Sequence, residues 1–245
     1  MKMSGNTILI TGGASGIGLA FAERLLQEGN TIIVCGRRES RLQEVQAQYP
    51  QMHTRVVDVA SEEDRIRLVN EIVTDFPELN VLMNNAGIQR NYSLTEGTES
   101  WVDQRGEIAT NLDAPIHLAT LLLPHLQKQP SAAIINVTSG LAFSPKASAP
   151  VYCATKAALH SFTLSLRHQL KNTSIEVIEI VPPGVNTDLG GSGLHTWGVP
   201  VDEFADGILA RLRTGEHEIG YGTSERNRTA SRAELDTVFE QMNNR

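Results

Sequence analysis

Short apolar segments rich in β-branched residues alternate with amphipathic segments along most of this chain, and this alternation is what most constrains its fold. It predicts strands at residues 7–11, 31–35, 55–59, 81–84, 133–138 and 176–181, and helices at residues 16–27, 39–48, 62–76, 101–128 and 152–170. Strands that alternate with helices form a parallel sheet, and right-handed crossovers place helices on both of its faces. We therefore expect a doubly wound α/β fold.

No proline- or serine-rich stretch and no block of like charge divides the 245 residues, of which 40% are hydrophobic. We therefore expect a single domain over residues 1–245. The 21 basic residues are scattered and are outnumbered by 28 acidic ones, which gives a net charge of −7. This balance argues against nucleic acid or an anionic membrane surface as a partner.

Other sequence features bear on location and metal binding. No run approaches twenty apolar residues, and the polar residues 4–6 lead directly into the first strand without room for a signal peptide. The two cysteines form no C-x-x-C pair. His117 and His125, like His160 and His168, stand two helical turns apart, so we interpret them as surface or packing residues and expect no metal site. These features predict a cytoplasmic protein.

A glycine-rich turn follows the first predicted strand, where residues 11–18 read Thr-Gly-Gly-Ala-Ser-Gly-Ile-Gly. Glycine lets the backbone approach a pyrophosphate, and the amide groups from Gly16 onward offer the positive end of a helix dipole. The spacing departs from the common G-x-G-x-x-G order, and no Gly-Lys-Ser/Thr follows. The turn therefore favours a dinucleotide over a nucleoside triphosphate, with an ordinary tight turn as the alternative.

Tyr152 and Lys156 stand four residues apart on a predicted helix, which places the phenol and the ammonium on one face. A neighbouring cation favours the phenolate and so lowers a tyrosine pKa from its ordinary value of about 10, toward the range of proton-transfer catalysis. The glycine turn, residues 84–87 and Ser139 all follow predicted strands. Because ligands of such sheets bind beyond the carboxyl ends of the strands, we expect these groups to meet in one crevice.

Pro115 stands four residues after Asn111 within the predicted helix at 101–128. Proline has no N–H to bond the Asn111 carbonyl, and its ring should kink the helix. We expect the freed carbonyl to take a water molecule as its partner.

Together these motifs resemble those of the short-chain dehydrogenases/reductases. The matching residues, in the order and spacing typical of that family, are Thr11-Gly-x-x-x-Gly16-x-Gly18, Asp58-Val59, Asn84-Asn85-Ala86-Gly87, Asn111, Ser139, Tyr152-x-x-x-Lys156 and Pro182…Val185-x-Thr187. The resemblance covers residues 5–222 and is greatest to the bacterial DltE-like branch, through Val181-Pro182-Pro183 and the segment 218–222. It implies a Rossmann-type sheet in the order 3-2-1-4-5-6-7.

The resemblance also implies an oxidoreductase that uses a pyridine nucleotide to interconvert a carbonyl and a hydroxyl group on a small molecule. In that role Tyr152 is the acid or base, and Ser139 holds the substrate oxygen. Lys156 lowers the tyrosine pKa and binds the nicotinamide ribose, while Asn111 holds a water that links Lys156 to solvent. The residues assigned to the cofactor are Gly12, Ser15, Gly16, Ile17, Gly18, Arg37, Asp58, Val59, Asn85, Ala86, Gly87, Tyr152, Lys156, Val185 and Thr187.

The choice of dinucleotide depends on the end of the second predicted strand, which reads Gly36-Arg37-Arg38 and carries no acidic residue for the ribose hydroxyls of NAD. Arg37, and Arg38 as a second candidate, can offer a planar fork to a 2′-phosphate. We therefore expect NADP(H) as the cofactor. The alternative is that both arginines point into solvent and that the protein uses NAD(H). Asp58 is expected to bond the adenine.

Three segments depart from the family pattern or extend beyond it. Pro183 replaces an expected glycine and stiffens the turn before Val185 and Thr187. Residues 188–200, rich in glycine, predict a mobile substrate lid, with a plain surface loop as the alternative. The extension at 223–245 ends in an amphipathic stretch that either docks on a partner subunit or frays.

Apolar residues lie on more than one face of the predicted helices at 101–128 and 152–170, which predicts a homodimer or homotetramer. Two other functions are considered. A dinucleotide-sensing regulatory or scaffold protein would share the fold, but the retained Tyr152 and Lys156 argue against it. A sugar-nucleotide epimerase or dehydratase would need more chain after the last strand.

Overall fold

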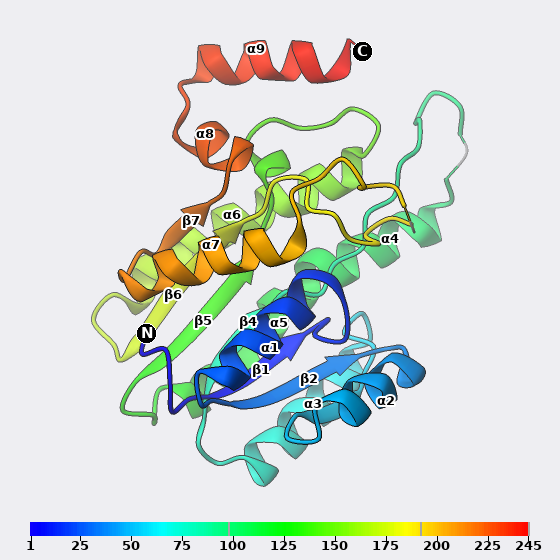
Figure 1. Cartoon of the computed structure of the whole chain (residues 1–245). Helices are drawn as coiled ribbons and strands as arrows, with labels where there is room; N and C mark the ends of the chain where they lie inside the picture. The colour runs from blue at the N-terminus through cyan, green and yellow to red at the C-terminus, as the bar shows by residue number, and fades with distance from the viewer. Residues whose placement is uncertain (98, 192, 245) are drawn as a thin grey trace.

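The computed structural model describes residues 1–97, 99–191 and 193–244. Within these residues a seven-stranded parallel sheet has the order β3-β2-β1-β4-β5-β6-β7, as the family resemblance implies (Figure 1). The strands are β1 (Thr7–Thr11), β2 (Thr31–Gly36), β3 (His53–Val56), β4 (Leu79–Asn84), β5 (Ala132–Val137), β6 (Ile175–Val181) and β7 (Glu218–Gly220). The third strand ends earlier than the predicted 55–59, because Val57 already leads into the loop that carries Asp58.

The helices are α1 (Gly16–Gln27), α2 (Glu39–Gln48), α3 (Glu62–Asp75), α4 (Trp101–Ile108), α5 (Ala114–Leu126), α6 (Pro150–Leu170), α7 (Val201–Arg213), α8 (Thr223–Thr229) and α9 (Arg232–Asn243). Successive residues of a strand face opposite sides of the sheet. Ile8 and Ile10 of β1 accordingly pack with α1, α2 and α7, whereas Leu9 packs with α3, α5 and α6. Both faces of the sheet are therefore covered.

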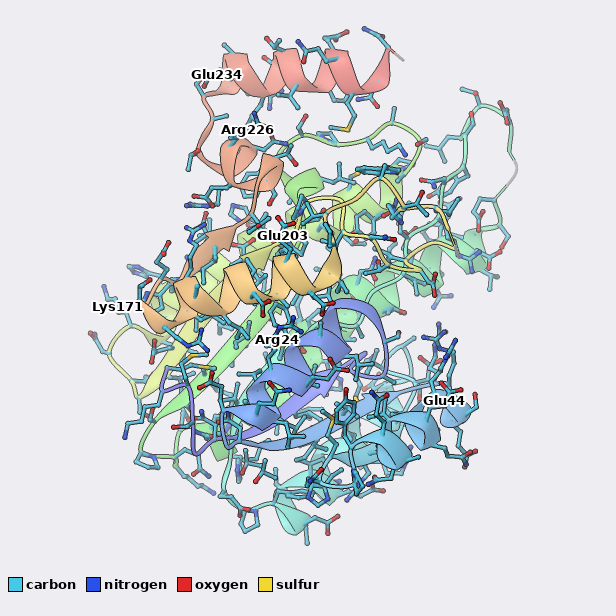
Figure 2. All side chains as sticks on the ribbon, in the orientation of Figure 1. Arg24, Glu44, Lys171, Glu203, Arg226 and Glu234 are labelled. Atoms are coloured by element: carbon cyan, nitrogen blue, oxygen red, sulfur yellow. The ribbon has the colours of Figure 1, made fainter. Side chains whose placement is uncertain are left out.

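Ion pairs on the surface join neighbouring helices. Arg24 of α1, which is labelled in Figure 2, pairs with Asp202 at 3.0 Å and Asp206 at 2.5 Å, both on α7. The carboxylates are largely exposed, so these pairs add little stability compared with the apolar contacts beneath them.

The prediction of one continuous helix at 101–128 is wrong in one respect. A π-helical turn, η1 (Ala109–Asp113), separates α4 from α5. The N–H of Ala114 bonds to the carbonyl of Ala109, five residues earlier. Pro115 follows in the first turn of α5 and has no N–H, so the hydrogen-bond ladder shifts its register here. The kink expected from Pro115 thus takes the form of a π turn that contains Asn111.

The C-terminal extension forms two helices, α8 and α9, and α9 stands apart from the sheet (Figure 1). Ser231 and Glu234 form a capping box at the start of α9. The side chain of Asn243 accepts a hydrogen bond from the N–H of Ala147 at 2.6 Å and donates one to the carbonyl of Pro145 at 3.1 Å. None of the helices in the described ranges is long and apolar enough to cross a membrane.

Candidate active site

A cleft of about 1530 Å³ runs along the carboxyl edge of the sheet, from the glycine turn to α9. The ends of β4 and β5, the start of α6 and the segment after β6 all contribute to its walls. Of the residues assigned to catalysis or to the cofactor from sequence, those that line the cleft are Gly12, Ser15, Gly16, Ile17, Arg37, Asp58, Val59, Asn85, Ala86, Gly87, Ser139, Tyr152, Lys156, Val185 and Thr187. Gly18 and Asn111 do not line it.

The glycines of the turn make close backbone approaches. Gly12 has φ of 65°, and a methyl group on it would lie 2.9 Å from the Cα of Ala86. A methyl group on Gly18 would lie 2.4 Å from Nδ2 of Asn85 and 2.5 Å from the carbonyl oxygen of Gly12. Gly18 therefore lets α1 pack against the turn from behind, while Gly12 and Gly16 form its open side.

Hydrogen bonds from the two residues that follow β4 hold the turn in place. The side chain of Asn85 donates to the carbonyl oxygens of Thr11 at 2.9 Å and Gly12 at 3.3 Å. In return, Oγ1 of Thr11 accepts from the N–H groups of Asn85 at 3.1 Å and Ala86 at 3.0 Å. The result is a fixed cradle, open to the cleft and lined by glycine backbone, that fits the phosphates of a dinucleotide.

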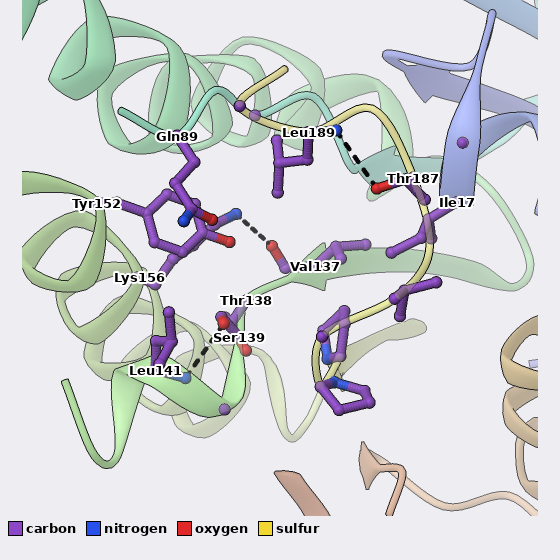
Figure 3. Close-up of a pocket in the computed structure, with 18 of the residues that line it drawn as sticks. Ile17, Gln89, Val137, Thr138, Ser139, Leu141, Tyr152, Lys156, Thr187 and Leu189 are labelled. Atoms are coloured by element: carbon purple, nitrogen blue, oxygen red, sulfur yellow. Dashed lines mark hydrogen bonds between the residues drawn. The ribbon is translucent and has the colours of Figure 1, made fainter. Parts of the chain in front are cut away.

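Tyr152, Lys156 and Ser139 lie together in the middle of the cleft (Figure 3). Tyr152 and Lys156 are 5% and 4% exposed and share one face of α6. The Nζ atom of Lys156 donates a 2.8 Å hydrogen bond to the carbonyl of Val137, the last residue of β5. Ser139 follows two residues later, and its Oγ accepts from the N–H of Leu141 at 3.1 Å. Ser139 thus shares one cleft with the glycine turn and residues 85–87, as expected from their positions after strands, and Tyr152 and Lys156 lie beside it.

Burial dominates the electrostatics of the Tyr152–Lys156 pair. It raises the pKa of Tyr152 above the ordinary value, while the Ser139 hydroxyl acts in the opposite direction. Burial also lowers the pKa of Lys156 to about 8, against the attraction of Glu179. The predicted lowering of the tyrosine pKa by Lys156 is not what this structure shows, because removal of the phenol from water is the larger effect.

Asn111 lies behind the cleft, in the π turn. Its side chain accepts from the N–H of Ile88 at 2.9 Å and donates to the Ile88 carbonyl at 2.8 Å and to Oγ1 of Thr155 at 3.3 Å. A methyl group on Gly87 would lie 3.5 Å from Oδ1 of Asn111 and 3.6 Å from Nζ of Lys156. Asn111 therefore ties the segment after β4 to α6 close to the lysine, and its bound water remains a prediction.

Two arginines stand at the end of the cleft that borders the glycine turn. Nη1 of Arg37 lies 4.0 Å from Oδ2 of Asp58, and the Arg37 side chain is 57% exposed. Arg38 donates a 2.9 Å hydrogen bond to Oγ of Ser15. Both guanidinium groups can thus reach a ligand that lies across the end of β2.

The predicted lid, residues 188–200, of which Ser192 lies outside the described residues, forms part of the cleft wall. Val199 pairs with Val185, and a methyl group on Gly184 would lie 2.4 Å from the ring of Trp197. Leu189 extends into the cleft (Figure 3). The segment thus rests on the turn after β6, and its mobility remains a prediction.

Gln89 is a cleft residue that the sequence reasoning missed. It is 8% exposed and lines the cleft (Figure 3), and its Nε2 lies 3.5 Å from Oδ1 of Asn91. Its position two residues after the Asn-Asn-Ala-Gly motif was the available signal, since that motif follows β4 directly.

Comparison with known proteins agrees with this geometry. The model of the short chain dehydrogenase family matches residues 6–195. A Bacillus subtilis (strain 168) protein described as an uncharacterized oxidoreductase, DltE, is 51% identical over 248 residues, which cover 99% of this chain and 98% of the relative. An uncharacterized oxidoreductase from Staphylococcus saprophyticus is 32% identical over 204 residues, covering 81% and 85% of the two chains.

Solved structures share the fold. A short-chain dehydrogenase from Burkholderia cenocepacia in complex with NADP superposes with a TM-score of 0.85 at 24% identity, covering 99% of each chain. One from Sphingobium yanoikuyae in complex with NADPH gives a TM-score of 0.81 at 24% identity, covering 95% of this chain and 92% of the other. With its sheet order, its cleft and a family match over most of its length, this chain belongs to the short-chain dehydrogenase/reductase family of oxidoreductases, in the branch of the Bacillus subtilis DltE protein.

Proposed function

We propose that the protein is an NADP(H)-dependent oxidoreductase that interconverts a carbonyl and a hydroxyl group on a small molecule. The observation that carries the proposal is the placement of Tyr152, Ser139 and Lys156 in one cleft with the glycine turn. A bound nicotinamide supplies or accepts the hydride. The protein must then move one proton and hold the reacting oxygen.

Tyr152 is the proton donor during reduction and the proton acceptor during oxidation. The phenol is protonated at neutral pH, as the reductive direction requires, although burial raises its pKa and so makes it a weaker acid. The Ser139 hydroxyl orients the substrate oxygen. Lys156 binds the ribose hydroxyls beside the nicotinamide and places its positive charge near the phenol, where it stabilises a developing phenolate.

The preference for NADP(H) rests on the arginines at the end of β2. Arg37 and Arg38 offer charge-assisted hydrogen bonds to a 2′-phosphate, and neither position carries the carboxylate that would repel it. Two structures of the same fold were solved with NADP or NADPH. Asp58, near Arg37, is assigned to the adenine.

A homodimer or homotetramer built through α4, α5 and α6 is part of the proposal. Trp101 and Val102 on α4 are 63% and 78% exposed, and Leu164 on α6 is 42% exposed. Large apolar groups on an exposed surface favour a subunit interface. A monomer mass in light scattering at micromolar concentration would contradict it.

The protein is also proposed to be cytoplasmic. Cys35 and Cys153 are buried free thiols, which favour a reducing compartment such as the cytoplasm.

The test is a substrate screen that follows NADPH oxidation with carbonyl compounds and NADP reduction with alcohols. We expect turnover that disappears in Tyr152→Phe, while the variant still binds NADPH. Tight dinucleotide binding without turnover on any compound would instead favour the regulatory function.

A further inference from the structure

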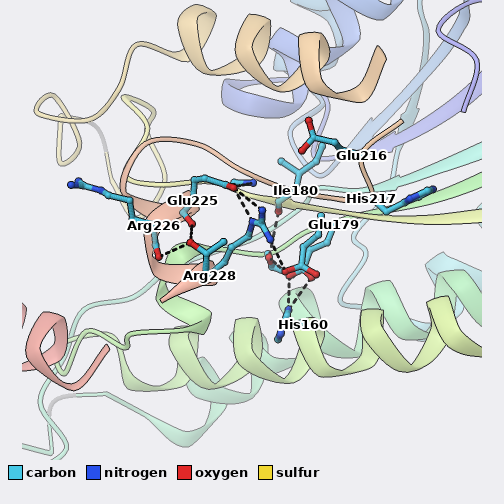
Figure 4. A network of polar contacts seen from close by, with 12 residues as sticks. His160, Glu179, Ile180, Glu216, His217, Glu225, Arg226 and Arg228 are labelled. Carbon is cyan, nitrogen blue, oxygen red and sulfur yellow. Dashed lines mark hydrogen bonds and ion pairs between the residues drawn. The ribbon is translucent and has the colours of Figure 1, made fainter. Parts of the chain in front are cut away.

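A buried carboxylate lies directly behind the proposed catalytic residues. Glu179 of β6 has no exposed surface, although its strand neighbours Ile178 and Ile180 are apolar. Its oxygens accept a hydrogen bond from Oγ1 of Thr138 at 2.6 Å and lie 2.9 Å and 3.0 Å from Nδ1 of His160 (Figure 4). Burying a carboxylate costs several kcal/mol unless it is paired and hydrogen-bonded, so His160 must carry its proton on Nδ1.

The partners of Glu179 belong to the two segments that carry the active site. Thr138 immediately precedes Ser139, and Val137, one residue earlier, accepts the hydrogen bond of Lys156. His160 stands one turn beyond Lys156 and two turns beyond Tyr152 on α6. The Glu179 carboxylate thus bridges the strand end that presents Ser139 and the helix that presents Tyr152 and Lys156.

The other charged groups near the Glu179–His160 pair lie on α6 and β7. The Lys156 ammonium interacts with Glu179, while Arg167 of α6 and Glu218 of β7 act on His160 with opposite charges. Glu179 raises the pKa of His160 above its ordinary value and opposes the effect of burial on Lys156. Glu179 is therefore the anion that attracts the Lys156 ammonium from the protein side.

The fold alone does not require this arrangement. Replacing a buried ion pair with apolar residues of similar volume is often neutral or stabilising. An aliphatic residue at 179 would continue the pattern of β6, in which Val177, Ile178, Ile180 and Val181 are buried. The acid at this position therefore serves something other than stability.

We propose that Glu179, held by His160 and Thr138, is a positioning residue that keeps Lys156 cationic and aligns α6 with the strand end of Ser139. The inference rests on the proposed function, because Glu179 and His160 are given a role that acts through Lys156. It adds that Glu179 and His160, which do not line the cleft, set the pH range in which the protein binds its dinucleotide and turns over substrate.

The test compares Glu179→Gln with wild type, since glutamine keeps the volume and removes the charge. Its Oε1 can still accept from Thr138, and its Nε2 can donate to an unprotonated Nδ1 of His160. The first measurement is the NADPH dissociation constant between pH 6.5 and 10 by fluorescence, which needs no substrate. We expect the alkaline loss of affinity to move about one pH unit toward acid in Glu179→Gln. Glu176→Gln, which removes from the same strand a partly exposed acid that pairs with the N-terminus and His217, is the matched control and should leave the profile unchanged.

The second measurement is the pH profile of kcat with any substrate found in the screen, where the same acidward movement is expected. His160→Asn, which keeps a donor near the position of Nδ1, should retain more activity than His160→Leu. A folded Glu179→Gln protein with the wild-type profile in both measurements would overturn the inference and leave the proposed function intact. Wild-type protein that binds NADPH but turns over no substrate would contradict the proposed function, while the binding profile would still decide the role of Glu179.

Discussion

The Nζ atom of Lys156 lies 5.8 Å from the centroid of the Tyr152 ring, and both side chains are almost completely buried. At this separation the ammonium is held near the phenol while its hydrogen bond goes to the Val137 carbonyl. Burial shifts the pKa values of the two groups in opposite directions, because it disfavours the charged form of each. The phenol keeps its proton, and the ammonium loses its proton more readily than a lysine in water.

The first prediction concerns the pH dependence of dinucleotide binding. The pKa of Lys156 is lowered to about 8, so its cation is present below that pH and is lost as the pH rises through it. We expect NADPH affinity to fall between pH 7 and pH 9.5, as measured by fluorescence titration. Lys156→Met should bind about tenfold or more weakly at pH 7, with no such fall. An unchanged wild-type affinity up to pH 9.5 would show that the charge of Lys156 does not hold the cofactor.

The second prediction concerns stability. Glu179 raises the pKa of His160 in the folded state. The contribution of His160 to the free energy of unfolding is therefore complete below its unfolded-state pKa of about 6.5, and it is lost as the pH rises through the folded-state pKa. The free energy of unfolding in urea should therefore decrease on this account as the pH rises above 6.5. His160→Asn should remove that part of the slope. The same slope in both proteins would mean that His160 is neutral in the folded state.

The third prediction concerns cofactor choice. Arg37→Asp should raise the NADPH dissociation constant by about tenfold to hundredfold and change that of NADH much less, because the new carboxylate repels a 2′-phosphate. Arg41→Asp is the matched control, since Arg41 lies four residues later and pairs with Glu44 at 2.7 Å on the surface. Wild-type protein that binds NADH as tightly as NADPH would contradict the assignment of Arg37.

The fourth prediction concerns packing behind the glycine turn. Gly18→Ala places a methyl group 2.4 Å from Nδ2 of Asn85, so Asn85 must move and release the turn. We expect a loss of about 1–3 kcal/mol in the free energy of unfolding, together with weaker dinucleotide binding. Gly106→Ala in α4 meets no atom within 4 Å and should be neutral or slightly stabilising. Equal thermal midpoints for the two variants would argue against the close packing.

The doubly wound parallel sheet and most of the cleft follow from the sequence, because buried parallel strands are visible as apolar runs and their carboxyl ends must meet at one edge. The strand order followed from the family resemblance. Residues whose roles depend on distant partners were harder to predict. Glu179 interrupts an apolar strand, and its partner His160 comes from another element, so the pair was not foreseen. Pro115 indicated a kink, but local sequence does not determine that the chain adopts a π turn. The pKa of Tyr152 depends on burial, which the fold determines.

The central claim is that Tyr152 transfers the proton, and Tyr152→Phe tests it most directly. The variant removes only the hydroxyl, which acts in the transition state and contributes little to cofactor binding. With any substrate found in the screen, we predict that kcat falls by at least about a hundredfold while the NADPH dissociation constant stays within about twofold of wild type. A Tyr152→Phe enzyme with near-normal kcat would contradict the mechanism.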